Sequence, residues 1–150
     1  MHTKKKRKLM SLLTVASVLT LTLSLDSCKS DDLSPSTKES AAKLLTSASW
    51  KVQSVTIDGI DKTSVFSGLI LSFTTSSFTA INGDPVWPAS GTWNFLDEEA
   101  KIIERNDGLE ITVSEISENK LGLTLDWSKT TFETGRNLSM KGVHKFNFGK

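Results

Sequence analysis

Apolar and polar residues alternate in short runs from Trp50 to the end of the chain. In the clearest run, 121–127, Leu or Trp stands at every second position, with Gly122, Thr124 and Asp126 between them. Because successive side chains of a strand point to opposite faces, this pattern indicates strands with one buried and one solvated face. We predict eight of them, over residues 49–58, 69–75, 77–82, 90–95, 101–105, 109–116, 120–127 and 138–148.

Short turns separate these segments. The Asn-Asp-Gly sequence at 106–108 is a strong hairpin signal, and the loop 82–88 begins with Asn-Gly-Asp-Pro. Consecutive short strands fit a β-sandwich or an up-and-down barrel. We favour an all-β, eight-stranded antiparallel meander that closes into a barrel, because closure leaves no exposed sheet edge. The first strand changes phase after Val52, which predicts a β-bulge near Gln53 or Ser54.

A helical pattern precedes the first strand. Ser36, with Glu39 three residues later, fits a capping box, and the apolar residues within 41–45 fall on one helical face. The residues before this helix, 28–36, are polar and acidic, as in a flexible tether. We therefore expect an acidic tether over 28–36, followed by a barrel domain over 37–150 that begins with a short helix.

The first residues of the chain have the order of features of an export signal. A cationic stretch, 4–8, precedes an apolar run, 9–25. The Leu-Asp-Ser-Cys sequence that ends at Cys28 resembles a bacterial lipobox, in which the cysteine is acylated and becomes the first residue after cleavage. We predict a lipoprotein signal peptide over 1–27 and lipidation of Cys28. Plain secretion and an uncleaved membrane anchor are the alternatives, since the apolar run has the minimum length of a spanning helix.

A lipobox, a short linker, a helix, a Trp that opens the first strand and a β-meander follow one another along the chain. This arrangement resembles the lipocalin-like lipoproteins of Bacteroidota. The residues that carry the resemblance are Cys28, Trp50, Gly91-Thr92-Trp93, Asn106-Asp107-Gly108, Gly135-Arg136, Gly142 and Phe146-Asn147-Phe148.

The resemblance has implications for fold and location. Lipocalins open with Gly-x-Trp, whereas this chain has Ala-Ser-Trp at 48–50. In lipocalins a late arginine packs across that Trp, and Arg136 is the nearest candidate here. The Lys-Ser-Asp-Asp sequence at 29–32 resembles the acidic tag that directs such lipoproteins to the cell surface. The resemblance thus implies a lipid-anchored outer-membrane protein that faces the cell surface, with a barrel for a small apolar molecule.

Charge and composition narrow the function. Five of the 18 basic residues and one of the 17 acidic residues precede Cys28, so the processed chain has 13 basic and 16 acidic residues and a net charge of −3. That balance argues against a nucleic-acid partner. After Cys28 the sequence contains one histidine, His144, and no cysteine, so a small hydrolase would have only His144 as its base. We predict a protein that is not an enzyme and that uses no metal or cofactor.

Aromatic residues supply the candidate binding site. Phe73, Trp93, Phe95, Trp127 and Phe146 lie on apolar strand faces and are predicted to line the barrel interior. An eight-stranded barrel is wide enough to hold one small ligand or to be filled by side chains. Both a ligand-binding site and a filled core therefore remain open for these five residues.

Trp87 differs because it stands between two prolines in the loop 82–90. An exposed ring there could gate the barrel mouth or contact a partner, and the alternative is a hydrophobic residue that anchors the loop. Two functions follow from the sequence. The first is binding of a small apolar ligand inside the barrel. The alternative is an interaction or structural lipoprotein with a filled barrel, which contacts protein or glycan through loops such as 82–90 and 128–137.

Overall fold

The computed structural model describes residues 36–133 and 136–150, and between 131 and 139 it describes the backbone alone. The predicted signal peptide, Cys28 and the tether before Ser36 lie outside the described residues. Helix and barrel belong to one compact unit. Within the described residues, no helix is long and apolar enough to cross a membrane.

The predicted N-terminal helix is confirmed as α1, Thr37–Leu45. Ser36 is its N-cap: the Ser36 hydroxyl accepts from the Glu39 backbone N–H at 3.1 Å, and the Glu39 carboxylate accepts from the Ser36 backbone N–H at 3.0 Å. This reciprocal capping box satisfies two backbone donors that a helix start would otherwise leave unpaired. Ala41 and Leu45 form the buried face of α1.

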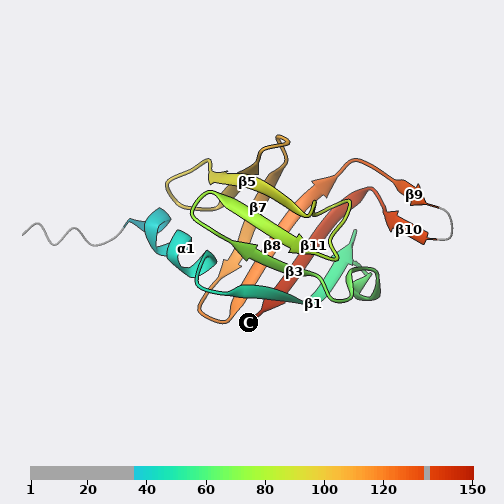
Figure 1. The fold of residues 1–150 in the computed structure, drawn as a ribbon, viewed down its shortest axis with the longest axis horizontal. Helices are drawn as coiled ribbons and strands as arrows, with labels where there is room; N and C mark the ends of the chain where they lie inside the picture. Colours follow the sequence, from blue (N-terminus) through green and yellow to red (C-terminus); the bar gives the residue numbers. More distant parts are fainter. Residues whose placement is uncertain (1–35, 134–135) are drawn as a thin grey trace, which may run out of the picture. The chain divides into compact units, whose positions relative to one another are not determined.

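The predicted fold class is also confirmed, since eight antiparallel strands close into a barrel (Figure 1). Each strand pairs with the next one along the meander, and the last strand pairs with the first. The barrel strands are β1 Ser49–Ile57, β3 Ile70–Phe73, β4 Ser77–Ile81, β5 Ser90–Phe95, β6 Ile102–Arg105, β7 Glu110–Ile116, β8 Lys120–Trp127 and β11 Gly142–Gly149.

The predicted β-bulge lies where β1 pairs with β11. The register of this pair shifts between Val52 and Ser54, as expected from the phase change in the sequence. The extra residue lets Trp50 and Val55 both face the interior, where both are fully buried. Because of the bulge, β1 contributes buried core residues both before and after the register shift.

The structure has elements that the sequence did not predict. β2, Ile60–Asp61, adds a short strand to the edge of β1, and a 3₁₀ helix, η1, spans Thr63–Phe66. The predicted strand 138–148 is wrong at its beginning. β9, Thr131–Glu133, and β10, Arg136–Ser139, form a separate two-stranded sheet, and β11 begins only at Gly142.

Trp50 links α1 to the barrel. Its indole N–H donates to the Leu45 carbonyl at 2.9 Å, and the Lys150 ammonium lies 5.4 Å from the centre of its ring. The side chain of Arg136, the candidate that the resemblance offered for this position, lies outside the described part of the structure. Its backbone belongs to β10, which is not part of the barrel sheet.

Candidate functional site

The candidate site lies at the end of the barrel opposite α1. Since α1 leads directly into β1 and the strands alternate in direction, the loop 82–89, the turn 106–109 and the end of β8 at Trp127 meet at that opposite end. We call these three segments the barrel mouth. The Lys38–Glu98 salt bridge, at 3.3 Å, ties α1 to the β5–β6 turn at the other end.

The loop 82–89 folds into the barrel instead of over it. Val86 is fully buried and only 1% of the Trp87 side chain is exposed. The Trp87 backbone N–H donates to the Gly83 carbonyl at 2.8 Å. A Cβ atom at Gly83 would lie 2.5 Å from the Trp87 Cβ and 2.9 Å from Leu69, so this inward turn requires glycine.

Trp87 spans the interior of the barrel. Its ring packs edge-on against Phe78 of β4, with ring centres 6.0 Å apart, and against Phe146 of β11, at 5.9 Å. The prediction of an exposed Trp87 ring that contacts a partner is therefore corrected. The residue lies in the predicted loop, but its ring is part of the core, because Phe78 and Phe146 on two separate strands hold it there.

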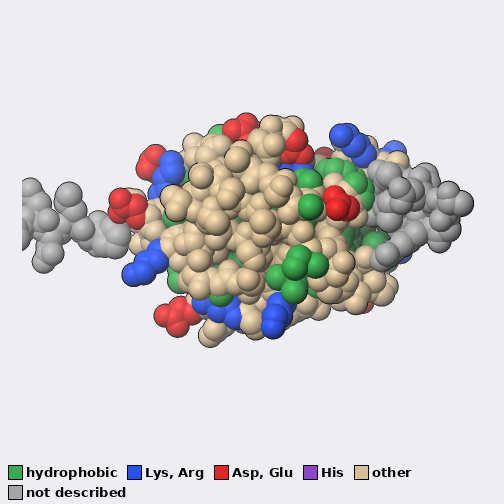
Figure 2. All heavy atoms as spheres, in the orientation of Figure 1, with side chains coloured by type: hydrophobic (Ala, Val, Ile, Leu, Met, Phe, Trp, Pro, Cys, Tyr) green, Lys and Arg blue, Asp and Glu red, His purple; other side chains and the backbone are tan. Residues whose placement is uncertain are grey.

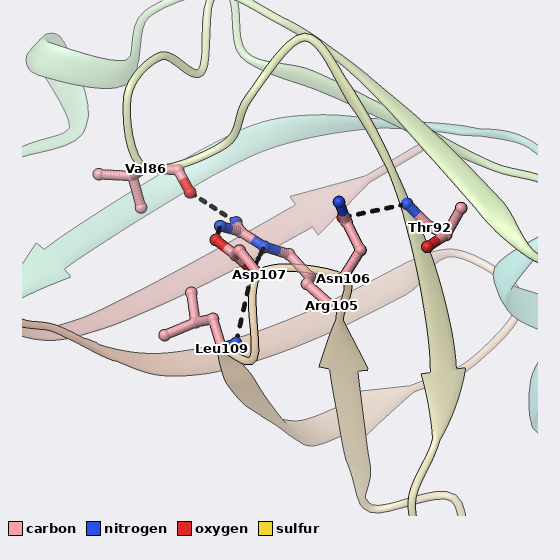
Figure 3. A network of polar contacts seen from close by, with 6 residues as sticks. All are labelled: Val86, Thr92, Arg105, Asn106, Asp107 and Leu109. Atoms are coloured by element: carbon pink, nitrogen blue, oxygen red, sulfur yellow. Dashed lines mark hydrogen bonds and ion pairs between the residues drawn. The ribbon is translucent and has the colours of Figure 1, made fainter.

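Arg105 holds the mouth in this arrangement (Figure 3). Only 2% of this residue is exposed. Its Nη1 donates to the Val86 carbonyl at 2.6 Å, and its Nε and Nη2 donate to the two carboxylate oxygens of Asp107 at 3.1 and 2.5 Å. The guanidinium carbon also lies 5.4 Å from the centre of the Trp87 ring. One buried cation thus joins the loop 82–89 to the turn 106–109.

The turn 106–109 provides the carboxylate that pairs with the Arg105 guanidinium. The Arg105 hydrogen bonds lower the pKa of Asp107, so its carboxylate is stabilised in the charged form. This contribution to stability is present above the pKa of an unfolded Asp and is lost as the pH falls through the lowered pKa. The Asn106 side-chain oxygen accepts from the Thr92 backbone N–H at 3.2 Å, which fixes the turn against β5. Figure 3 shows both contacts around one hairpin.

A pocket of about 370 Å³ opens at the mouth. It lies outside the closed interior, between the loop, the turn and the end of β8. Its lining residues are Pro85, Pro88, Ser90, Arg105, Asn106, Asp107, Trp127 and Lys129.

The five residues predicted to bind a ligand inside the barrel are all buried. Trp93 packs against Phe73 and Phe95, with ring centres 5.8 and 5.1 Å away, and Trp93 and Phe95 also line a pocket of about 430 Å³ beside α1. Phe146 packs against Trp87. Trp127 stands at the mouth, where it lines the pocket.

His144 faces the interior beside Phe146 and is fully buried. Its Nδ1 lies 2.9 Å from the Gly142 carbonyl, so Nδ1 carries the proton and donates it. Burial lowers the pKa of His144, which is therefore neutral at pH 7. Its hydrogen-bond partner is a backbone carbonyl, unlike the base of a hydrolytic triad, which an acid orients.

Three nitrogen atoms of these rings are buried without a hydrogen-bond partner. His144 Nε2 and the indole nitrogens of Trp87 and Trp127 have less than 1 Å² of accessible surface, and none has a hydrogen-bond partner among the described residues. Edge-on contacts with Phe78 and Phe146 place ring faces next to Trp87. These ring contacts of Trp87 indicate a core filled by side chains at the mouth end.

The visible surface of the molecule carries charges of both signs. Figure 2 shows acidic and basic side chains interspersed on this face, so it is not dominated by charge of one sign. Among the described residues, no cluster of three His, Cys, Asp or Glu side chains could hold a metal ion.

Sequence reasoning missed Arg105, the residue on which the mouth depends. The signal for it was present, because Arg105 follows Ile103 by two positions and so shares the inward face of β6. The partner of Arg105, the Val86 carbonyl, is 19 positions away and is brought close only by the path of the loop.

Comparison with models of protein families gave no match to this chain, and comparison with curated proteins gave none either. The structure therefore describes a closed antiparallel barrel whose mouth is filled from within by the loop 82–89, with a pocket on the outside of that mouth.

The burial of His144 predicts a dependence of stability on pH. As the pH falls below 7, the unfolded chain takes up a proton near pH 6.5, whereas the folded chain takes it up only at a lower pH. Over that interval the folded state loses stability by up to about 1.4 kcal/mol per pH unit. His144→Phe should remove this slope. His144 is the only histidine after residue 2. Urea unfolding of the parent protein and of His144→Phe at each pH therefore measures the contribution of His144 to the pH dependence of stability. Equal slopes in both proteins would contradict the burial of a neutral His144.

Proposed function

We propose that this chain is a lipid-anchored, surface-exposed and non-enzymatic lipocalin-like lipoprotein of the outer membrane. The proposal is supported by the cationic and apolar segments before Cys28, by the lipobox-like sequence at 25–28 and by the closed barrel that follows. Acyl chains on Cys28 would hold the protein at the membrane, since each buried CH₂ contributes about 0.8 kcal/mol.

Of the two functions open from the sequence, we propose the interaction protein with a filled barrel, which contacts its partner through the loops of the mouth. One observation carries this choice. Trp87 is touched from three barrel strands, by Phe78 of β4, Arg105 of β6 and Phe146 of β11. A ring held from three sides takes up the space at the mouth end that an apolar ligand in the barrel would need.

The anchor is tested by Cys28→Ala in the full-length chain. We expect loss of acyl labelling and loss of the protein from the membrane fraction, because the acylated thiol is the attachment point. Ser30→Ala, two residues away, serves as the matched control and should keep both. If the Cys28→Ala protein stays in the membrane after a carbonate wash, the apolar run 9–25 acts as a spanning anchor and the proposal is wrong.

The filled barrel is tested with two apolar probes, a fluorescent fatty-acid analogue and indole. The processed chain should bind neither probe saturably, whereas Trp87→Ala should bind indole, because removing the side chain vacates space for about one such ring beside Phe146. Lys145→Ala, an exposed position on β11, is the control for non-specific effects and should behave like the parent protein. Stoichiometric binding of the probe by the unaltered protein would favour the ligand carrier over the interaction protein.

A further inference from the structure

The pocket of about 430 Å³ beside α1 opens at the end of the barrel opposite the mouth. Two core rings, Trp93 and Phe95, line it next to Ala42 of α1. Its volume lies within the range of small-molecule sites, which combine apolar walls with a few polar groups. The polar and charged residues of the lining are Lys38, Glu39, Thr75, Ser76 and Asn94.

The two charged side chains of this pocket present no net charge to a ligand. The Lys38 ammonium pairs with the Glu98 carboxylate at 3.3 Å, and the Glu39 carboxylate accepts from the Ser36 backbone N–H at 3.0 Å. Lys38 and Glu39 also have opposite signs. A charged group on a ligand would lose its water here without gaining an unpaired partner, which is unfavourable. The pocket therefore fits an uncharged molecule.

The polar side chains of the pocket still have free hydrogen-bonding groups. Among the described residues, the hydroxyls of Thr75 and Ser76 and the amide of Asn94 have no hydrogen-bond partner. Each of these groups can both donate and accept. A molecule with several hydroxyl groups and one apolar ring edge would match these groups and the two aromatic rings beside them.

The walls of the pocket are fixed before a ligand arrives. The Trp93 indole N–H donates to the Thr74 and Ser77 carbonyls, both at 3.1 Å, and so ties β5 to the turn between β3 and β4. On the other side, α1 is held by its salt bridge to the β5–β6 turn and by the hydrogen bond from Trp50. Little of the binding energy is therefore spent on ordering the site.

The sheet surface that continues from the pocket is uncharged. Only Asp84 is charged among residues 63–96, whereas the 23% of charged residues in the whole chain would place about eight in such a segment. β3, β4 and β5 contain no charged residue. Figure 2 shows no charged side chain in the middle of the visible face, where Figure 1 places β3. An uncharged partner complements this surface.

Hydroxyl groups follow one another across this surface. Ser49, Ser72, Thr79 and Ser90 lie directly opposite one another on β1, β3, β4 and β5, and we call these four positions the hydroxyl row. Neighbouring strands are about 4.8 Å apart, so the row is about 14 Å long. Among the described residues, the hydroxyls of Thr79, Ser90 and Thr92 have no hydrogen-bond partner. The surface thus repeats the free donors and acceptors of the pocket.

The composition of this surface argues against other macromolecules. A nucleic acid is held by Lys and Arg, which β3, β4 and β5 lack. Interfaces between proteins are enriched in aromatic residues and Arg and depleted in Ser. The exposed positions of β4 and β5 are instead Thr79, Ile81, Ser90, Thr92 and Asn94. A chain of uncharged sugars is the polymer whose own hydroxyl groups match this surface.

We propose that the pocket beside α1 binds one sugar residue of an uncharged glycan, and that the glycan chain continues over the hydroxyl row. The edge of the sugar ring lies against Trp93 and Phe95. Its hydroxyl groups bind Thr75, Ser76 and Asn94. The proposal goes beyond the proposed function, because this site lies on the barrel wall at the α1 end and not at the mouth. Indole and the fatty-acid analogue lie outside this ligand class, since neither has hydroxyl groups for the three polar side chains.

The test follows the indole N–H signals by two-dimensional NMR in the processed chain from residue 28 on, with Cys28→Ser. Maltohexaose and laminarihexaose are the uncharged probes, and hexagalacturonate is the acidic probe of equal length. We expect a saturable shift of the Trp93 signal with at least one uncharged probe and weaker binding of hexagalacturonate. The Trp127 signal, at the mouth, should not move.

Two variants locate the glycan. Thr79→Val keeps the shape of the side chain and removes its hydroxyl, so we expect binding about fivefold weaker, as for loss of one neutral hydrogen bond. Thr112→Val, at an exposed position of β7 outside this surface, is the matched control and should bind like the parent protein. An unchanged Trp87 signal in each variant shows that the fold is intact.

Ala42→Leu fills the pocket from α1 and should abolish the shift of the Trp93 signal. Lys43→Leu adds the same side chain at the next, exposed position of α1 and should leave the shift unchanged. Because leucine is a good helix former, both variants keep α1.

The proposal is overturned if neither uncharged probe gives a saturable shift, or if hexagalacturonate binds as tightly as they do. It is also overturned if binding survives both Thr79→Val and Ala42→Leu without change, or if only the Trp127 signal moves. Sedimentation of the processed chain as a dimer that Thr79→Lys separates would assign the surface to a second copy of the chain and overturn it too. None of these results changes the expected loss of anchoring in Cys28→Ala.

Discussion

The interior of a closed eight-stranded barrel must be filled. In this structure the filling of the interior determines the path of the loop 82–89 and the contacts at the barrel mouth. Such a barrel is just wide enough for side chains or one small ligand. Here the ring of Trp87 enters from the loop 82–89 and reaches Phe78 and Phe146, which belong to separate strands. Edge-on ring pairs of this kind stabilise a core beyond the area that they bury. The loop therefore behaves as a part of the core.

A loop that enters the core also buries polar backbone groups, which need hydrogen-bond partners. Arg105 provides such a partner. The buried Val86 segment presents a carbonyl group, to which the guanidinium donates at 2.6 Å. The guanidinium is in turn neutralised by Asp107, since an unpaired buried cation would be strongly destabilising. The same pair forms one side of the pocket at the mouth. The packing of the interior and the chemistry of the pocket thus depend on a single side chain.

The sequence was sufficient for features that depend on neighbouring residues. Alternation located the barrel strands, the phase change after Val52 located the bulge, and Ser36 with Glu39 located the start of α1. The burial of Trp87 could not be predicted in this way, because it depends on contacts with Phe146, 59 positions later in the chain.

The candidate site was predictable only in part for the same reason. The loop 82–90 was singled out from its prolines, and Trp127 from its strand, but the pocket exists only where the loop, the turn 106–109 and β8 meet. Lys150, at the far end of the sequence from Trp50, lies over the ring of Trp50. Neither the pocket nor the contact between Lys150 and Trp50 can be predicted from residues that are close together in the sequence.

The most direct test of a barrel filled by its own loop is a set of nuclear Overhauser effects between aromatic ring protons in the processed chain. The structure predicts cross-peaks from the Trp87 ring to both Phe146 and Phe78, whose ring centres lie 5.9 and 6.0 Å away. Cross-peaks from Trp87 only to neighbouring loop residues, with fast exchange of its indole proton with water, would contradict the account.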